Sequence, residues 1–236
     1  MTVERALTGG IIAAGEGRRL RRDGWAVPKP LVPVAGVPLI AGVIENFLAA
    51  GITSLRIIVN GQERECVDWV RSRFPALDAE FIVKTTASSL ESFIEVAAAE
   101  DGGPMLVSTV DAWCAEADFA RFVEAACRRG PGATVLAVTP LVADENPLWV
   151  DVDDTGRVTA LGGGAGGLVT AGVYLVPARV RQTTPPPELG RLREYLAWLW
   201  RRGDPMYGDV VETVVDVDRA EDVALAEALA LTVRRS

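Results

Sequence analysis

Short apolar runs alternate with helix-like patterns through residues 1–140, and this alternation is the strongest constraint on the fold. The apolar runs predict buried strands, and the stretches between them have helical spacing. Strands are expected at Leu7–Ala14, Leu55–Val59, Phe81–Val83, Met105–Val110 and Thr134–Val138. Helices are expected at Pro38–Ala50, Glu63–Phe74, Ser88–Ala99 and Ala115–Arg129. Repeated β-α units predict an α/β fold with a mainly parallel sheet covered by helices on both faces.

The pattern changes after Pro140. Two short strands are expected around the hairpin turn Asp153-Asp154-Thr155-Gly156, followed by a glycine-rich hinge and further elements. Strands are predicted at Trp149–Val152, Arg157–Leu161, Thr170–Val176 and Val210–Val217, a hinge at Gly162–Gly167, and helices at Leu189–Arg201 and Ala220–Leu231. We expect a single domain, 1–236, whose second half, 141–236, is inserted at the edge of the sheet and over its C-terminal rim.

Composition excludes several classes of site. A net charge of -8 disfavours nucleic acid as a partner, because phosphate-backbone binding needs a basic face. The chain has no histidine, so Ser-His-Asp triads and HExxH zinc sites are impossible. Cys66, Cys114 and Cys127 lack CxxC spacing, which disfavours zinc and disulfides and predicts small buried thiols. No stretch has the length and apolar character of a signal peptide or membrane span, so we expect a cytoplasmic protein without a membrane partner.

A glycine loop and a lysine follow the first expected strand. Only Lys29 and Lys84 are lysines, whereas arginine supplies the other positive side chains. A lysine chosen at position 29 suggests that a compact point charge is needed there. The loop Gly15-Glu16-Gly17 can bring backbone N–H groups against an anion, because no Cβ blocks the approach. Alone, this loop is equally compatible with a tight structural turn; with Arg19 and Lys29 it predicts a polyphosphate site.

The stretch GIIAAGEGRRL, followed by PKPLVPVAGVPLI, resembles the signature of sugar-nucleotide pyrophosphorylases and related nucleotidyltransferases. The resemblance is strongest over residues 7–60. It implies the nucleotide-diphospho-sugar transferase fold, a Rossmann-like three-layer α/β/α arrangement around a mainly parallel mixed sheet. It also divides the chain into a nucleotide-binding half, 1–140, and an acceptor-binding half with a closing helix, 141–236. By resemblance, Ala13, Ala14, Gly15 and Gly17 bind the nucleotide, Arg19 contacts β- and γ-phosphate oxygens, and Lys29 stabilises charge during transfer.

Two aspartates are implied as ligands of Mg²⁺. Asp111 follows the strand Met105–Val110, where open α/β sheets bind ligands, and it matches the metal-binding aspartate of the family. Mg²⁺ prefers one or two carboxylates together with phosphate oxygens and water. The stretch from Glu212 to Asp222 resembles the late segment that delivers a second metal aspartate. Asp216 is the better match and Asp218 the reserve, since alternating strand residues would point to opposite faces. Helix capping is the alternative role for Asp111 and Asp218.

Two further segments are implied to bind the substrates. Thr85, Thr86 and Ala87 occupy the place of the loop that reads the nucleobase in the family, although Lys84 could equally be an exposed lysine at a strand end. Gly172 and Tyr174 resemble the acceptor-side strand. One departure concerns the acceptor: many relatives carry a Glu-Lys-Pro lysine that holds its phosphate, and this chain has no lysine after Lys84. As replacements we consider Arg157, Arg179 and Arg181, none of which matches a family motif.

The resemblance therefore predicts a Mg²⁺-dependent nucleotidyltransferase that transfers NMP from an NTP to a phosphorylated small molecule and releases pyrophosphate. A sugar 1-phosphate is the favoured acceptor, giving an NDP-sugar. The alternative is a cytidylyltransferase acting on inositol phosphate, phosphocholine or a similar phosphate. A glycosyltransferase of the same broad fold is disfavoured, because no acidic-x-acidic motif surrounds Asp111. A non-catalytic binder would not need both metal carboxylates. The nucleobase, the acceptor and a homo-oligomeric state are left open.

Overall fold

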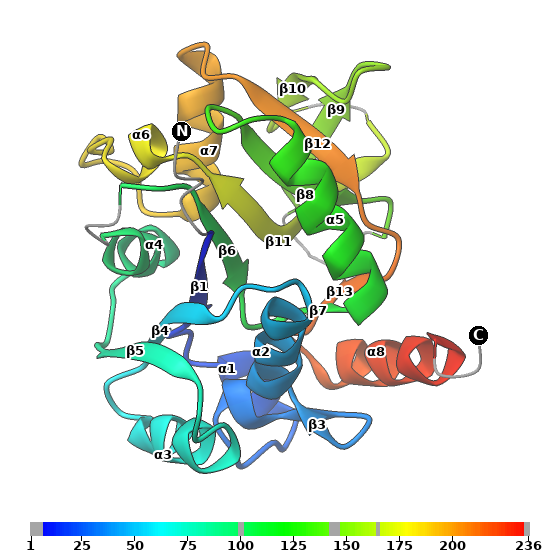
Figure 1. Cartoon of the computed structure of the whole chain (residues 1–236). Coiled ribbons are helices and arrows are strands. Elements are labelled where there is room, and N and C mark those ends of the chain that lie inside the picture. The colour runs from blue at the N-terminus through cyan, green and yellow to red at the C-terminus, as the bar shows by residue number, and fades with distance from the viewer. Residues whose placement is uncertain (1–6, 99–101, 142–146, 164–165, 234–236) are drawn as a thin grey trace.

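The computed structural model describes residues 7–98, 102–141, 147–163 and 166–233 (Figure 1). A nine-stranded sheet forms the centre of the molecule. Its first half is parallel, with the order β6-β1-β4-β5. These strands are β1 (Thr8–Ala13), β4 (Ser54–Val59), β5 (Asp78–Val83) and β6 (Met105–Thr109). The predicted β-α alternation of the first half is confirmed.

The second half of the chain enters the sheet rather than only adding to its edge. β11 (Leu168–Val176) lies antiparallel between β6 and β8 (Thr134–Thr139), and β12 (Met206–Val210) runs parallel to β8. β9 (Trp149–Val152) and β10 (Val158–Leu161) form the expected hairpin, with β9 paired to the start of β11. The expectation of an insertion at the edge is therefore wrong for β11, whose nearly continuous apolar sequence suits a strand buried on both faces.

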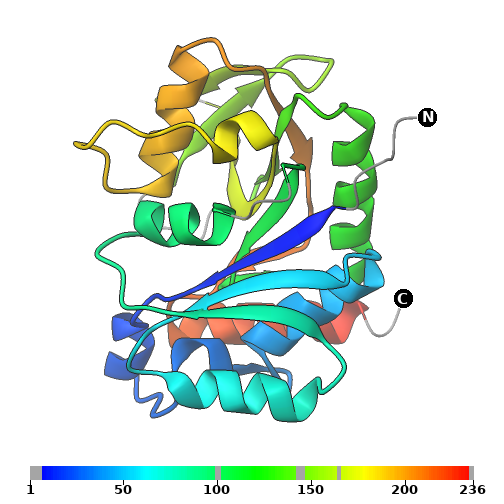
Figure 2. The same ribbon diagram turned by 60° about the vertical axis from the view of Figure 1, so that its left-hand side comes forward.

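Helices cover both faces of the sheet and build two cores. Along β1 and the residue after it, Ile11 and Ala13 face one core, and Ile12 and Ala14 face the other, as strand alternation requires. The first core is covered by α2 (Leu39–Ala49), α3 (Arg64–Arg73), α5 (Glu116–Arg128) and α8 (Ala220–Val233). The second is covered by α4 (Ser89–Ala97), α6 (Ala178–Arg181) and α7 (Leu192–Arg201). Figure 2 shows these two helical layers on opposite sides of the sheet. The predicted three-layer α/β/α architecture is confirmed.

Several boundaries differ from the sequence prediction. The single strand expected at Val210–Val217 is two strands, β12 and β13 (Val214–Asp216). β13 leaves the main sheet and pairs with β7 (Ala112–Cys114), with Asp216 opposite Ala112. The helix expected from Leu189 begins at Leu192 instead. Residue 99, which ends one predicted helix, lies outside the described residues. So do residues 164 and 165, which belong to the predicted glycine hinge.

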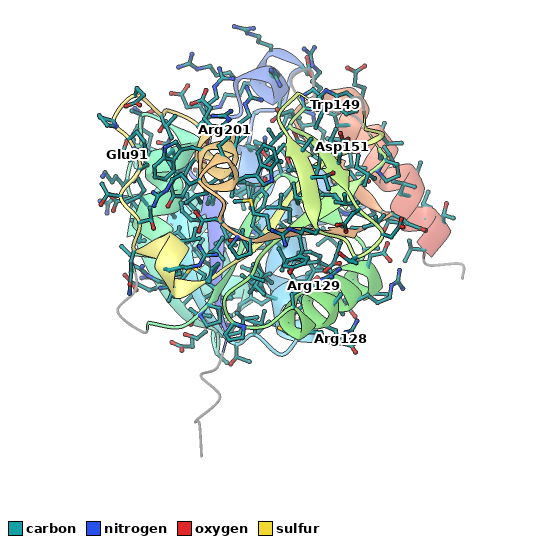
Figure 3. The ribbon with its side chains drawn as sticks, turned by 90° about the horizontal axis from the view of Figure 1, so that it is seen from above. Glu91, Arg128, Arg129, Trp149, Asp151 and Arg201 are labelled. Carbon is teal, nitrogen blue, oxygen red and sulfur yellow. The ribbon has the colours of Figure 1, made fainter. Side chains whose placement is uncertain are left out.

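Short elements that the sequence analysis missed surround the glycine loop. They are α1 (Arg18–Arg22), the 3-10 turn η1 (Lys29–Leu31), and the two-stranded pair β2 (Pro33–Val34) and β3 (Val37–Pro38). At the far end of the sheet, Arg129 fixes the β9–β10 hairpin to the end of α5 (Figure 3). Its guanidinium donates to the carbonyl of Thr155 and pairs with Asp209 at 2.7 Å.

The cysteines only partly match the expectation. Cys66 and Cys114 are buried free thiols, and burial raises the pKa of each to about 12. Cys127 is also free but exposed, which corrects the prediction of three buried thiols. It lies near the end of α5, where the outer face of the helix meets solvent. Among the described residues, no helix combines the length and apolar character needed to cross a membrane.

Candidate active site

The chemistry-bearing residues meet where the parallel strands end. The glycine loop follows β1, Asp111 follows β6, and Asp216 closes β13 beside β7. The amide of Val110 donates to the carbonyl of Ile12, and the amide of Val217 donates to the carbonyl of Asp111. These two hydrogen bonds fix the three segments beside one another. Open α/β sheets bind ligands at this edge.

The two loop glycines serve different purposes. Gly17 has a φ of 59°, and a Cβ added there would lie 2.7 Å from the Cβ of Lys29. Both facts favour glycine, because side chains disfavour this left-handed conformation and the lysine stem is already in contact. At Gly15 a Cβ would meet nothing within 4 Å, and the residue lines a cavity. Gly17 is thus required by the fold, whereas Gly15 leaves space for a ligand.

Lys29 is buried among carboxylates. Its side chain is 7% exposed, and its Nζ donates to Asp111 at 2.7 Å and also to Asp218. Burial alone lowers the pKa of an ammonium group, but attraction to Asp111, Asp218 and Asp216 outweighs it and raises the pKa of Lys29 above its ordinary value. Lys29 is therefore a fixed positive charge at any physiological pH. The choice of lysine over arginine fits this narrow, buried position.

Three carboxylates gather around Lys29. Asp111, Asp216 and Asp218 each offer an oxygen, and these oxygens lie within 4.8 Å of one another. Burial raises the pKa of Asp111, but its bond to Lys29 overrides this and holds the pKa below the usual value. Arg19 donates to Asp218 at 2.8 Å. The cluster therefore contains both a dense negative charge and the two cations expected at the site.

The Asp218 carboxylate lies in the same cluster as that of Asp216. Strand alternation would point the two side chains to opposite faces, which makes Asp218 the reserve in the sequence prediction. However, β13 ends at Asp216, so the alternation does not extend to Asp218. Helix capping does not occupy its carboxylate either: Asp222 accepts the amides of Asp218 and Arg219, while the Asp218 side chain bonds Arg19 and Lys29. Asp111 likewise bonds Lys29 rather than capping α5, which begins at Glu116.

Two cavities adjoin at this cluster. The smaller, about 480 Å³, is lined by the glycine loop, by Lys29 and by the start of α4. The larger, about 850 Å³, is lined by β11 and by the start of α7. Arg19, Asp111 and Asp218 line both cavities, so charged groups lie at their junction. The arrangement provides one compartment on each side of a shared charged centre.

The predicted nucleotide-binding residues lie around the smaller cavity, with two exceptions. Ala14, Gly15, Gly17, Thr86 and Ala87 line it. Ala13 faces the core instead, and Thr85 is not among the described lining residues, since its hydroxyl donates to Asn60.

Ser88 and Ser89 at the start of α4 also line the smaller cavity, and they belong to the segment that the resemblance places at the base-reading loop and helix start. Ser88 is the N-cap of α4, and its hydroxyl accepts the amide of Glu91. A serine just before a helical run is the sequence signal for this position. Lys84 pairs with Glu91 and Glu95 on α4, so it is a strand-end lysine that fixes the helix.

Gly172 and Tyr174 lie in the wall of the larger cavity. Gly172 has a φ of 74° within an irregular stretch of β11, and a Cβ there would lie 2.6 Å from the hydroxyl of Thr109. Burial raises the pKa of Tyr174 to about 12, assisted by the charges of Asp216 and Asp111, so its phenol stays neutral. Tyr174 can therefore offer a hydrogen-bond donor beside the carboxylates.

The arginines considered for the acceptor phosphate lie elsewhere. Arg179 pairs with Asp204 and donates to the carbonyl of Gly132, and Arg181 donates to the carbonyls of Ala97 and Gly103. Arg157 is not among the described residues lining either cavity. Arg191 and Arg193, at the start of α7, line the larger cavity instead. No sequence signal distinguishes these two arginines from the others, because their position beside the cavity depends on how α7 packs.

Comparisons with known proteins agree with this geometry. The family profile of the MobA-like NTP transferase domain matches residues 9–170, more than half of the chain. A 2-aminoethylphosphonate cytidylyltransferase from Lancefieldella rimae is 27% identical over 158 residues, which cover 65% of this chain and 60% of that protein. A mannose-1-phosphate guanyltransferase from Gibberella zeae is 34% identical over 119 residues, covering 46% of this chain and 31% of that protein. The chain thus spans about 60% or less of the length of these curated relatives.

Solved structures share the fold at low identity. The inositol-1-phosphate CTP transferase from T. maritima has a TM-score of 0.78 at 16% identity, covering 92% of this chain and 91% of that chain. An apo UDP-glucose pyrophosphorylase has a TM-score of 0.75 at 13% identity, covering 97% and 99%. The resemblance read from the glycine loop and the Pro-Lys-Pro segment is confirmed: the chain belongs to the MobA-like NTP transferase domain family.

Proposed function

We propose that the protein transfers NMP from an NTP to the phosphate of a small molecule, with a sugar 1-phosphate as the favoured acceptor. The observation that carries this proposal is the position of Lys29, Arg19 and the aspartate cluster at the junction of two cavities. The NTP would occupy the smaller cavity and the acceptor the larger one. The cytoplasm is the proposed compartment, in keeping with three free thiols.

The reaction needs positioned positive charge rather than a protein base. An acceptor phosphate oxygen would attack the α-phosphorus of the NTP, forming a new P–O bond as the bond to pyrophosphate breaks. The acceptor phosphate is already an anion, so no proton must be removed. Lys29 and Arg19 would stabilise the charge that develops on the phosphate oxygens, because preorganised groups in a partly buried site act strongly on it. Gly15 would let the triphosphate approach the backbone.

Asp111, Asp216 and Asp218 suit a divalent metal such as Mg²⁺. They supply only carboxylate oxygens, the hard ligands that Mg²⁺ prefers, and they lie close together at the cavity junction. When bound, Mg²⁺ would neutralise phosphate charge between the two substrates. Lys29 would keep Asp111 and Asp218 ionised and in place for it.

A second candidate is a cytidylyltransferase. It is favoured by the similarity to the cytidylyltransferase of L. rimae and to the CTP transferase of T. maritima. The acceptor would then be inositol phosphate or another non-sugar phosphate. The two candidates share the same site and differ in nucleobase and acceptor.

A pyrophosphate-release assay tests both candidates. Each of CTP, UTP, GTP, ATP and dTTP would be paired with sugar 1-phosphates, inositol 1-phosphate, phosphocholine and 2-aminoethylphosphonate, with Mg²⁺ present. Acceptor-dependent pyrophosphate that disappears in Lys29→Ala supports the proposal. Absence of release for every pair, from folded protein, would overturn it.

A further inference from the structure

The larger cavity has a wall that the family resemblance did not assign. Its floor is formed by β11 and the aspartate cluster, and the start of α7 closes another side. Arg191 and Arg193 line this wall, although the chain contains no lysine after Lys84 that could hold an acceptor phosphate. The wall therefore carries cationic side chains in the compartment that the proposed function gives to the acceptor.

The start of α7 is held firmly against α4. The amide of Leu192 donates to the hydroxyl of Ser89 at 3.1 Å, and Ser89 lines both cavities. One turn later, the buried ring of Tyr195 packs on Phe93 with 5.9 Å between ring centroids. The Tyr195 hydroxyl donates toward the carbonyls of Val180 and Thr183. Because these contacts fix the first turn of α7, Arg191 and Arg193 start from a rigid position beside the cavity.

The acidic residues of the same wall are partly engaged. Glu194 accepts the amides of Gly190 and Arg191, each at 3.0 Å, and so closes the first turn of the helix. Glu188 also lines the cavity but is exposed in the connector before α7. On this wall, the guanidinium groups of Arg191 and Arg193 lie beside the carboxylates of Glu194, which is engaged, and Glu188, which is exposed. Two guanidinium groups favour an anionic group on the ligand. Planar guanidinium groups suit phosphate or carboxylate oxygens.

The side chains that line the larger cavity also indicate which chemical groups the acceptor carries besides its phosphate. Among the described lining residues, Tyr174 is the single aromatic, so an aromatic cage for a quaternary ammonium group is not formed by them. Residues 142–146 and 164–165, which the structure does not describe, contain no aromatic side chain in the sequence. Hydroxyl groups of Thr139 and Thr170 do line the cavity. Hydroxyls are suitable partners for a polyol and offer little to a trimethylammonium group.

Resting on the proposed function, we infer that Arg191 and Arg193 bind an anionic group of the acceptor, and that this acceptor is a phosphorylated polyol rather than a phosphorylated quaternary ammonium compound. The polyol class includes sugar phosphates and inositol phosphates. The carboxylates that line the larger cavity, Asp111, Glu188, Glu194, Asp216 and Asp218, outnumber its arginines. The preference therefore rests on the hydroxyl groups and on the lack of an aromatic cage among the described lining residues.

A binding experiment tests this without requiring turnover. Glucose 1-phosphate, inositol 1-phosphate and phosphocholine are titrated calorimetrically into the protein with Mg²⁺ and non-hydrolysable NTP analogues. The proteins compared are wild type, Arg191→Ala, Arg193→Ala and the matched control Arg201→Ala. Arg201 is an exposed arginine at the opposite end of α7 (Figure 3). Each loss of a charged hydrogen bond should weaken polyol phosphate binding about 10-fold or more.

The outcomes separate this inference from the proposed function. Weaker polyol phosphate binding in Arg191→Ala and Arg193→Ala, with NTP-analogue binding and Arg201→Ala unchanged, supports it. Wild-type affinity in both variants overturns it, as does phosphocholine binding as tightly as the polyol phosphates, or no polyol phosphate binding at all. If Arg193→Ala lowers the melting temperature, the polyol phosphate affinities of Arg193→Lys and of Arg191→Ala decide the test, because Arg191 is exposed. The proposed function fails separately, through absence of pyrophosphate release.

Discussion

Lys29 and Asp111 are 82 residues apart in the chain, and their side chains are joined by a hydrogen bond of 2.7 Å. Lys29 lies in the turn after the glycine loop, and Asp111 follows β6. β1 and β6 are neighbouring parallel strands, so the segments after their C-terminal ends must meet. The same contact fixes a buried cation and a negative group at the junction of the two cavities.

Replacing Lys29 should remove activity without unfolding the protein. Lys29→Ala is expected to lower turnover about 100-fold to 1,000-fold, the usual loss when one preorganised charge-stabilising group is removed. Lys29→Arg should rescue poorly, because a planar guanidinium cannot replace a compact ammonium in this buried position. Steady-state pyrophosphate release measures the effect.

The only other lysine in the sequence provides the control. Lys84→Ala removes surface ion pairs to Glu91 and Glu95, so its turnover should stay within about 2-fold of wild type, since exposed pairs contribute little. Full turnover in Lys29→Ala would contradict the assignment of this residue.

The two loop glycines should separate folding from binding. Gly17→Ala forces a side chain into a φ of 59° and against Lys29, so it should lower the free energy of unfolding by about 1–2 kcal/mol. Gly15→Ala meets no atom within 4 Å and should leave stability nearly unchanged. Its methyl group would instead fill space in the smaller cavity and raise the NTP KM. Urea unfolding and KM measurements on both variants test this, and equal KM values for Gly15→Ala and wild type would contradict a phosphate-binding role.

Alkaline pH should destabilise the folded protein. Burial raises the pKa of Cys66 and Cys114 from 9.0 to about 12, and that of Tyr174 and Tyr195 from 10.0 to about 12. Above pH 9 the unfolded chain therefore loses protons that the folded protein retains. Each group can then lower the free energy of unfolding by up to about 1.4 kcal/mol per pH unit until its folded pKa is reached.

Between pH 7 and 8.5 the stability should be nearly constant, because the chain has no histidine to titrate. Urea unfolding at a series of pH values tests both statements. A stability that rises between pH 9 and pH 11 would contradict the assignment of these four buried groups.

The sequence predicts the first half of the fold well because its signals are local. Apolar runs and helical spacing mark β1, α2 and β4 within a few residues. The placement of β11 between β6 and β8 is decided by pairing between distant segments, which no local pattern reveals. The same holds for the division of Val210–Val217 into β12 and β13, since only tertiary pairing with β7 draws the second part out of the main sheet.

The candidate site also contains residues that local sequence signals predict and residues that only tertiary packing places there. Arg19, Lys29 and Asp111 could be found because they sit in a short motif or directly after a strand. Asp218 joins the cluster of Asp111 and Asp216 because β13 ends at Asp216, so strand alternation does not extend to Asp218. Arg191 and Arg193 could not be found from spacing, since the contact between Leu192 and Ser89 places α7 beside the cavity. Arg179 and Arg181, which the sequence analysis considers for the acceptor phosphate, are engaged in structural contacts.

The three aspartates should differ in what their loss does to the metal requirement. Asp111→Asn and Asp216→Asn each keep the size of the side chain but remove a charge that would hold Mg²⁺. Both should abolish most activity at low Mg²⁺ and regain part of it at high Mg²⁺. Asp218→Asn should also lower turnover, because its carboxylate positions both Lys29 and Arg19. Turnover measured against Mg²⁺ concentration, with thermal melts of each variant, distinguishes these roles. An aspartate that only capped a helix would lose about 1 kcal/mol of stability and keep its turnover. That result for Asp111 or Asp216 would exclude it as a metal ligand.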